Sequence, residues 1–217
     1  EKRRKTMIIK PNVLKDKLNE YDLENIFLNE DLVISKLIEK KKFNNIDLED
    51  IEINTCIFKD TKFISSKIIK SYFVDVIFEN CDLSNINFTK STFKRVRFKN
   101  CKLLGSDFSY SYFENITFEE CNMQNSYFDM CNFSNTIFET SNITNASISN
   151  SNLRNVYFEN NDLSFCNFSK TCLKNIDLSS NLLNNITVYQ EDLKGVILSS
   201  EQALEFIKLI GIKIKGV

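Results

Sequence analysis

Residues 78–88 read "FENCDLSNINF" and place large apolar residues at Phe78, Leu83 and Phe88, five positions apart. An amphipathic helix repeats its apolar residues about every 3.6 positions, and a pleated strand repeats them every second position. The period of five continues without a break over residues 43–198, where all 32 positions are apolar and sixteen of them are Phe. This register predicts a repeat protein whose structural unit is five residues long.

The large apolar residues are expected to face the interior of the fold. The residue two positions before each of them is a second candidate for an inward-facing side chain. From Ile46 to Val196 these 31 positions hold Ile, Val, Ala, Cys, Ser or Thr, with exceptions at Asn161, Asn181 and Glu191. Two residues after each large residue, Asn occurs thirteen times and Gly twice, and both residue types tolerate the positive φ of a tight turn. Each unit is therefore interpreted as one short side of a coil, with two residues facing inward, followed by a turn.

Closure of a coil after four such sides gives a turn of 20 residues, and this longer period is also present. Phe recurs at intervals of 20 positions, at Phe58, Phe78, Phe98, Phe118, Phe138 and Phe158. A coil of two or three sides would not produce this spacing. We therefore predict an all-β solenoid of about eight four-sided coils, stacked about 4.8 Å apart, with these Phe side chains in one column.

The C-terminal residues 199–217, "SSEQALEFIKLIGIKIKGV", predict a helix that closes one end of the solenoid. Ser199 and Gln202 have the spacing of a capping box, and Gly211 can end the helix. Such a cover is needed because an open coil exposes unpaired backbone groups and an apolar interior. The same helix is a candidate contact between two copies of the chain, through Leu204, Phe206, Ile207 and Ile210.

The N-terminal residues keep apolar side chains at intervals of five but lose the small inward position, which is taken by Tyr21, Asp31, Lys36 and Lys41. We expect a helical or irregular cap through about residue 30, followed by an imperfect first coil. The predicted organisation is thus a cap and imperfect coil over residues 1–42, a solenoid over 43–198 and a helical cap or dimer contact over 199–217. Met7 is a candidate natural start, which would make residues 1–6 an upstream extension or an added segment.

Catalytic chemistry is not indicated. The chain has no His, which removes the usual general base and most catalytic zinc sites, and its four Gly residues exclude a Gly-rich phosphate loop. Asp and Asn residues that precede a large residue, such as Asp82 and Asn142, are expected to form local hydrogen bonds to turn backbone. We expect no enzyme activity, no cofactor and no metal.

Six of the seven cysteines occupy the small inward position: Cys56, Cys81, Cys101, Cys121, Cys131 and Cys166. Two hypotheses compete. The first is a ladder of thiolates that binds metal, or a disulfide, and the second is a small apolar filler of the core. We favour the filler, because side chains one coil apart are too distant for the Cβ spacing of a disulfide. Cys172 is the exception and is expected to face outward.

The overall charge gives no push toward nucleic acid or an acidic membrane, since the formal net charge is -1. No run of 18 apolar residues and no secretory signal is present, so we expect a cytoplasmic protein without membrane association. Charge is nevertheless uneven. Residues 84–106 contain six basic and no acidic residues, whereas residues 107–163 contain eight acidic residues against Arg154.

In the 20-residue geometry, carboxylates line one edge of the rod. The candidate partner-binding residues are Glu79, Glu119, Glu120, Glu139 and Glu159, with Lys99 in the gap. Regularly spaced carboxylates on a narrow rod can imitate the phosphate rows of duplex DNA. A solvated charged face is the alternative. The basic belt lacks a recognisable nucleic-acid motif, and no direct binding of nucleic acid is expected.

The units "CDLSN" (81–85), "CNFSN" (131–135) and "SNLRN" (151–155) match the A(D/N)Lxx consensus, and the chain resembles the pentapeptide-repeat family over residues 43–198. The resemblance implies a right-handed quadrilateral β-helix. Several members are DNA mimics that bind DNA gyrase and topoisomerase IV, protect them from quinolones and dimerise through a C-terminal helix. The unbroken register leaves no room here for the projecting loops of the quinolone-resistance branch.

The tail "QALEFIKLIGIKI" (202–214) and the unit "EDLKG" (191–195) are similar to uncharacterised family members of low-GC Gram-positive bacteria, which imply no activity. The leading hypothesis is a non-enzymatic binding protein that acts as a DNA mimic on gyrase or topoisomerase IV. The alternative is a scaffolding module that docks proteins through exposed aromatic side chains. Its candidate contacts are Tyr72, Tyr110, Tyr112, Tyr127 and Tyr157.

Overall fold

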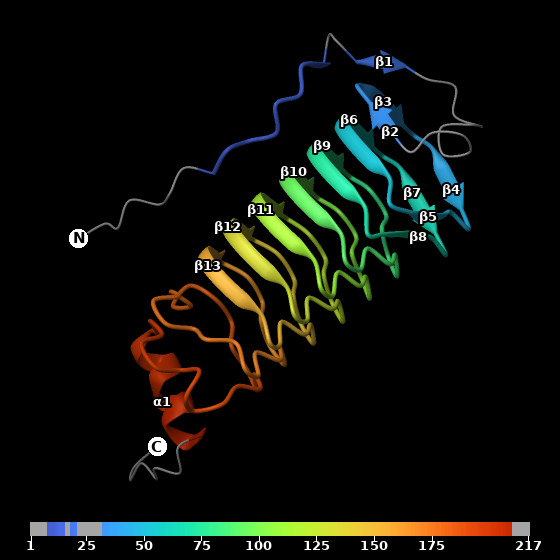
Figure 1. Ribbon diagram of the computed structural model, residues 1–217. Coiled ribbons are helices and arrows are strands. Elements are labelled where there is room, and N and C mark those ends of the chain that lie inside the picture. Colours follow the sequence, from blue (N-terminus) through green and yellow to red (C-terminus); the bar gives the residue numbers. More distant parts are fainter. Residues whose placement is uncertain (1–7, 16–17, 21–31, 210–217) are drawn as a thin grey trace.

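The chain forms a right-handed solenoid in which every turn has four sides of five residues (Figure 1). The computed structural model describes residues 8–15, 18–20 and 32–209. Residues 20 apart are paired in parallel, for example Phe78 with Phe98 and Phe98 with Phe118. A positive φ recurs at every fifth position from Ser35 to Asn175, so a corner follows each side. The predicted four-sided β-helix is confirmed.

One parallel nine-stranded sheet covers two sides of the rod, in the order β1-β3-β6-β9-β10-β11-β12-β13, with β2 also pairing β6. The other two sides carry the short pairs β4-β7 and β5-β8 and then isolated bridges such as Asp82 with Lys102. The strands are β1 (Asn19–Glu20), β2 (Leu32–Ile34), β3 (Lys36–Glu39), β4 (Lys42–Asn44), β5 (Asp47–Glu49), β6 (Glu52–Lys59), β7 (Lys62–Ile64), β8 (Lys67–Ile69), β9 (Tyr72–Glu79), β10 (Thr92–Lys99), β11 (Tyr112–Glu119), β12 (Asn132–Glu139) and β13 (Asn152–Glu159).

The expected count of about eight coils is slightly too high, because about six turns carry the full eight-residue strand, from β6 to β13. The apolar register continues to residue 198, but beyond β13 the turns pair only through single bridges such as Asp162 with Leu182 and Asp177 with Ile197. The count of coils from the period of five is too high because it includes C-terminal units whose backbone does not form a strand.

The core is a set of stacked aromatic columns. The rings of Phe58, Phe78, Phe98, Phe118, Phe138 and Phe158 follow one another with centroid separations of 4.9–5.0 Å and interplanar angles of 5–13°. The exposed fraction of Phe98 and Phe118 is 0%. Offset stacking and burial both favour this arrangement, and the predicted Phe column is confirmed.

The small inward side chains hydrogen-bond to the preceding turn. Thr171 Oγ1 donates to the carbonyl oxygen of Ile148 at 2.7 Å, and Cys131 Sγ lies 3.1 Å from that of Phe108. Both partners are 23 positions earlier, so a hydroxyl or thiol at this position satisfies a buried carbonyl group as well as filling space. This explains why Ser, Thr and Cys share the position with Val and Ile.

The six inward cysteines are buried and Cys172 is exposed, as predicted. Burial raises the pKa of Cys56 to about 11 and those of Cys131 and Cys166 to about 12. Because the thiolate is the reactive form, we expect a thiol reagent such as Ellman's reagent to modify one cysteine in the native protein and seven after denaturation. Rapid modification of more than one native thiol would contradict the packing of these side chains.

The two inward asparagines, Asn161 and Asn181, form a buried amide ladder. Asn161 Nδ2 donates to Asn181 Oδ1 at 3.0 Å and to the carbonyl oxygen of Phe138 at 2.9 Å, while Asn161 Oδ1 accepts from the amide of Ser141 at 3.0 Å. Asn181 Nδ2 in turn donates to the carbonyl oxygen of Phe158 at 2.9 Å. Polar side chains are thus tolerated in the interior because their hydrogen bonds are satisfied.

Helix α1 (Ser200–Leu209) covers the C-terminal end. The predicted capping box forms, because the amide of Gln202 donates to Ser199 Oγ at 3.2 Å and the amide of Ser199 donates to Gln202 Oε1 at 2.8 Å. Gln202 Nε2 also donates to the carbonyl oxygens of Leu178 and Asn181 at 3.0 and 2.8 Å. The helix therefore satisfies open backbone groups of the last turn. The predicted end at Gly211 lies outside the described residues.

The N-terminal residues 8–15, here called the strap, contain no α-helix and extend along the side of the rod (Figure 1). The amide of Asn12 donates to Asp75 Oδ1 at 2.9 Å, and that of Ile9 lies 3.4 Å from Asn115 Oδ1. Further along, β1 pairs with β3. Much of the predicted N-terminal cap lies outside the described residues, and contact of the strap with the middle of the rod was not predicted.

Candidate functional site

The predicted acidic edge is a row at the carboxyl ends of the long strands. Pairing places Glu119, Glu139 and Glu159 directly after one another at the ends of β11, β12 and β13. Glu79 lies in the same row at the end of β9, and Lys99 at the end of β10 separates it from Glu119. Successive members are one turn apart, about 4.8 Å.

Glu120 does not belong to this row. It is the corner residue that follows Glu119, with a φ of 54°, and its side chain is exposed. The five predicted residues therefore form one row of four carboxylates with a fifth beside it.

Two cations neutralise the middle of the row. Glu119 Oε1 lies 3.1 Å from Lys99 Nζ, and Glu119 Oε2 accepts from Arg97 Nε at 3.0 Å. Burial acts to raise the pKa of Glu119, but the hydrogen bonds and charges of Arg97 and Lys99 prevail and hold it below its ordinary value. Arg97 is the residue that sequence reasoning missed here, because its partner lies 22 positions away, diagonally across the sheet.

The row consequently has two parts of different charge pattern. From β3 to β11 acidic and basic residues alternate, as Glu39, Lys59, Glu79, Lys99 and Glu119. Lys59 Nζ and Glu39 Oε1, for example, are 2.8 Å apart. Beyond Glu119 the row is purely acidic, at Glu139 and Glu159. The part that most resembles a line of phosphates is thus the C-terminal end of the row, with Glu120 beside it.

Aromatic side chains form a second candidate surface. The exposed fractions of Tyr72, Tyr110, Tyr112 and Tyr127 are 49–58%, and Met130, one turn after Tyr110, is 46% exposed. Tyr157 is half-buried rather than exposed, which corrects the expectation for that residue. It lies on β13 in the row next to the carboxylates.

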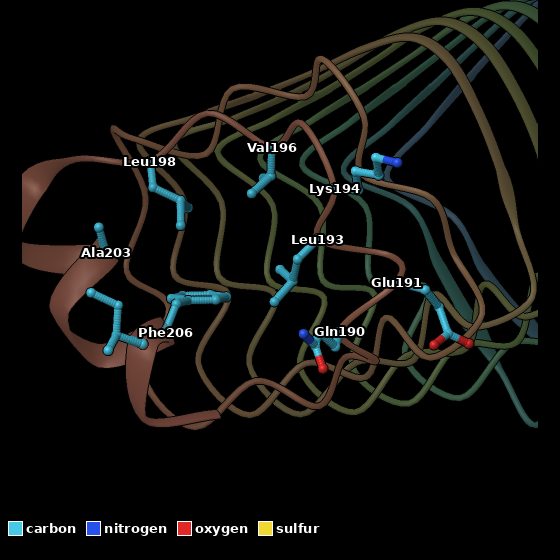
Figure 2. A pocket seen from close by; sticks show the side chains of 9 residues that line it. Gln190, Glu191, Leu193, Lys194, Val196, Leu198, Ala203 and Phe206 are labelled. Atoms are coloured by element: carbon cyan, nitrogen blue, oxygen red, sulfur yellow. The ribbon is translucent and has the colours of Figure 1, made fainter. Parts of the chain in front are cut away.

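A hollow of about 630 Å³ lies between the last turn and α1 (Figure 2). Leu193, Val196 and Leu198 line it from the last turn, and Ala203 and Phe206 line it from the helix, with Phe206 reaching toward Leu193 (Figure 2). The lining is largely apolar, so this end of the rod can accept an apolar group.

The predicted dimer residues have different environments. Phe206 is 9% exposed and packs on the core, Ile207 is half-buried at the hollow, and Leu204 is 41% exposed. Ile210 lies outside the described residues. Phe206 therefore belongs to the cap itself, whereas Leu204 and Ile207 remain accessible to a second molecule.

The described part of the chain contains no group of three His, Cys, Asp or Glu residues arranged to hold a metal ion. Carboxylate and amide side chains that precede large residues form the predicted hydrogen bonds to turn backbone. Asp82 Oδ1, for example, accepts from the amide of Ser84 at 3.3 Å, and Asn142 Oδ1 accepts from that of Thr144 at 3.1 Å.

In the described ranges, no helix has the length and apolar character needed to span a membrane.

A parallel four-sided coil with a five-residue unit defines a β-solenoid repeat protein. The family model described as "Pentapeptide repeat region" matches residues 37–108, 71–148, 91–168 and 111–188, which together cover more than half of the sequence. The chain therefore belongs to the pentapeptide repeat family. No curated protein sequence matches it.

Several solved structures share this architecture. HetL, a pentapeptide repeat protein involved in heterocyst differentiation regulation from the cyanobacterium Nostoc sp. Strain PCC 7120, is 14% identical, with a TM-score of 0.47 and coverage of 78% of this chain and 90% of HetL. A trypsin-treated variant of QnrB1, a plasmid-mediated fluoroquinolone resistance protein, is 20% identical, with a TM-score of 0.43 and coverage of 91% and 96%. At these identities and TM-scores the likeness assigns no function.

Proposed function

We propose that this protein is a non-enzymatic, cytoplasmic binding protein whose acidic row is recognised by a protein that otherwise binds DNA. DNA gyrase or topoisomerase IV is the named candidate partner. The observation that carries the proposal is the run Glu119, Glu139 and Glu159, in which each carboxylate is paired in register with that of the next turn. The phosphates of one DNA strand repeat every ~3.4 Å, so charges about 4.8 Å apart offer a similar linear field.

The ion pairs at Glu119 reduce the number of carboxylates that are proposed to contact the partner. Since Arg97 and Lys99 neutralise that carboxylate, the proposed contact centres on Glu139 and the corner residue Glu120, with Glu159 at the end of the row. The family resemblance adds support, because some pentapeptide-repeat proteins act on gyrase as DNA mimics.

We further propose homodimerisation through Leu204 and Ile207 at the C-terminal end, and a closer kinship with the uncharacterised members of low-GC Gram-positive bacteria.

The test is inhibition of gyrase supercoiling by the purified protein, titrated with and without a fluoroquinolone. We expect inhibition that weakens with salt and falls by at least about tenfold in the variant Glu119→Lys, Glu139→Lys, Glu159→Lys, because the attraction is electrostatic.

A variant with the same change in net charge, Asp50→Lys, Asp177→Lys, Glu191→Lys, is the control, since these three exposed residues lie off the row. Equal loss of inhibition in both variants would show that net charge matters and the row does not. Absence of any effect of the wild-type protein on gyrase or topoisomerase IV would refute the named partner.

A scaffolding role is the second candidate, favoured by the exposure of Tyr110, Tyr112, Tyr127 and Met130 on the middle turns. Tyr and Met are enriched in the cores of protein interfaces. Binding through this surface would be lost on Tyr110→Ala and Tyr112→Ala and would depend little on salt. The charge-reversed row would leave it unchanged, so the same set of variants separates the two functions.

A further inference from the structure

The strap lies on a defined column of corner residues, here called the strap column. It consists of Asp75, Arg95, Asn115, Asn135 and Asn155, one per turn, each with a positive φ. Arg95 Nε and Nη2 donate to Asp75 Oδ1 and Oδ2 at 2.7 and 2.6 Å, while Asn135 Nδ2 and Asn155 Nδ2 lie 3.4 and 3.1 Å from the amide oxygen of the preceding Asn. Asp75 and Asn115, which contact the strap, are 8% and 4% exposed, whereas Asn155 is exposed.

The spacing of the strap matches that of the column. Ile9 and Asn12 are three residues apart, which is about 10 Å in extended chain, and Asn115 and Asp75 are two turns apart, which is about 9.6 Å. Every third amide of an extended segment can therefore meet an acceptor on every second turn. The turn that is skipped carries Arg95, which has no acceptor to offer.

The column continues beyond Asn115 with the same chemistry. Asn115 Oδ1 accepts both from Asn135 Nδ2 and from the strap amide, which uses its two lone pairs. Asn155 is two turns beyond Asn115 and therefore in phase with the same spacing. A hollow of about 330 Å³ lies beside this part of the column, lined among others by Tyr112, Glu114, Asn132, Ser134, Asn152 and Arg154.

The described strap residues are held lightly. They form no strand ladder with the rod, and their backbone contacts are to side-chain oxygens. Ile8, Pro11 and Val13 are half-buried, whereas Ile9 and Leu14 are 58% and 50% exposed. A segment bound in this way can be displaced by another of the same kind, because each hydrogen bond to a side chain contributes only modestly.

We propose that the strap column and the adjoining hollow form a binding groove for an extended polypeptide segment of another protein, and that the strap is its built-in competitor. The segment that fits has small apolar side chains turned toward the rod and free backbone amides three residues apart. This mode differs from addition of a strand to a sheet edge, because the peptide runs along the rod axis and across the strands.

The test uses a fluorescent peptide with the strap sequence, "IIKPNVLK", titrated against the full chain. Wild-type protein is compared with Ile9→Pro/Asn12→Pro, which removes the two donating amides while proline remains compatible with an extended backbone. Lys10→Pro is the control, since it adds a proline between the two contacts. We expect the double variant to bind the peptide about tenfold more tightly than wild type and the control, because the resident competitor is weakened.

Adding Asn115→Leu to the double variant removes the amide oxygen that accepts the hydrogen bond and keeps a side chain of similar size. This change is expected to reverse the gain in peptide affinity. Peptide binding that is equal in wild type, control and double variant would overturn the proposal, and so would a gain that Asn115→Leu leaves unchanged.

Discussion

Replacing Phe118 with Ala is expected to lower the free energy of unfolding by about 3–5 kcal/mol. The ring is 0% exposed and stacks between Phe98 and Phe138, with centroid separations of 4.9 Å on both sides. It also meets Phe108 and Phe128 edge-on. The backbone on every side is tied to the next turn, so the structure cannot collapse into the cavity, and nearly all of the lost contact remains lost.

The measurement is urea unfolding followed by circular dichroism, with Tyr112→Ala as the matched control. Tyr112 is an aromatic residue of the same strand, β11, but it is 58% exposed, so its loss is expected to change stability by less than about 0.5 kcal/mol. Phe118→Leu should fall between the two, because it keeps part of the apolar volume. A loss below about 1 kcal/mol for Phe118→Ala would contradict a rigid aromatic column.

The repeat made this column predictable. Each Phe repeats after 20 residues, and the same spacing sets the strand register, so a count along the sequence is also a count along the rod axis. The row of Glu119, Glu139 and Glu159 could be predicted for the same reason. Periodicity determines which side of the rod a residue occupies.

Periodicity does not determine where a long side chain reaches. Arg97 belongs to one row, yet its guanidinium pairs with Glu119 in the neighbouring row of the next turn. The neutral middle of the acidic row therefore escaped prediction. The contact between the strap and the rod could not be predicted for a related reason. Residues 8–15 lie outside the repeat, and they contact side chains 63 and 106 positions away.

The corners show where local preference is overridden. Asn is suited to positive φ, and many corners carry it. Thr55, Thr140 and Phe165 nevertheless adopt φ values of 50–62°. Their neighbours in the stack impose the corner through parallel hydrogen bonds, so the unfavourable local conformation is maintained by the rest of the turn. Residue preference alone does not predict these corners, whereas the period of five does.

Asn161→Ala is expected to lower the free energy of unfolding by about 2–6 kcal/mol, although it removes far less volume than the change at Phe118. Asn161 is 2% exposed, and its amide group serves Ser141, Phe138 and Asn181. Alanine would leave the amide of Ser141 and the carbonyl oxygen of Phe138 without these partners in the interior. Each buried polar group left in this way costs about 1–3 kcal/mol, which sets the expected range.

Asn161→Ser is the matched variant, because serine already performs both roles one half-turn earlier. Ser151 Oγ donates to the carbonyl oxygen of Phe128 at 2.8 Å and accepts from the amide of Cys131 at 3.0 Å, at the same position of its own unit. Serine at position 161 should therefore recover most of the stability, to within about 1 kcal/mol of wild type, in the same urea titration. If alanine and serine proved equally destabilising, the hydrogen bonds of the ladder would not be the source of the effect, and the size of the asparagine side chain would be.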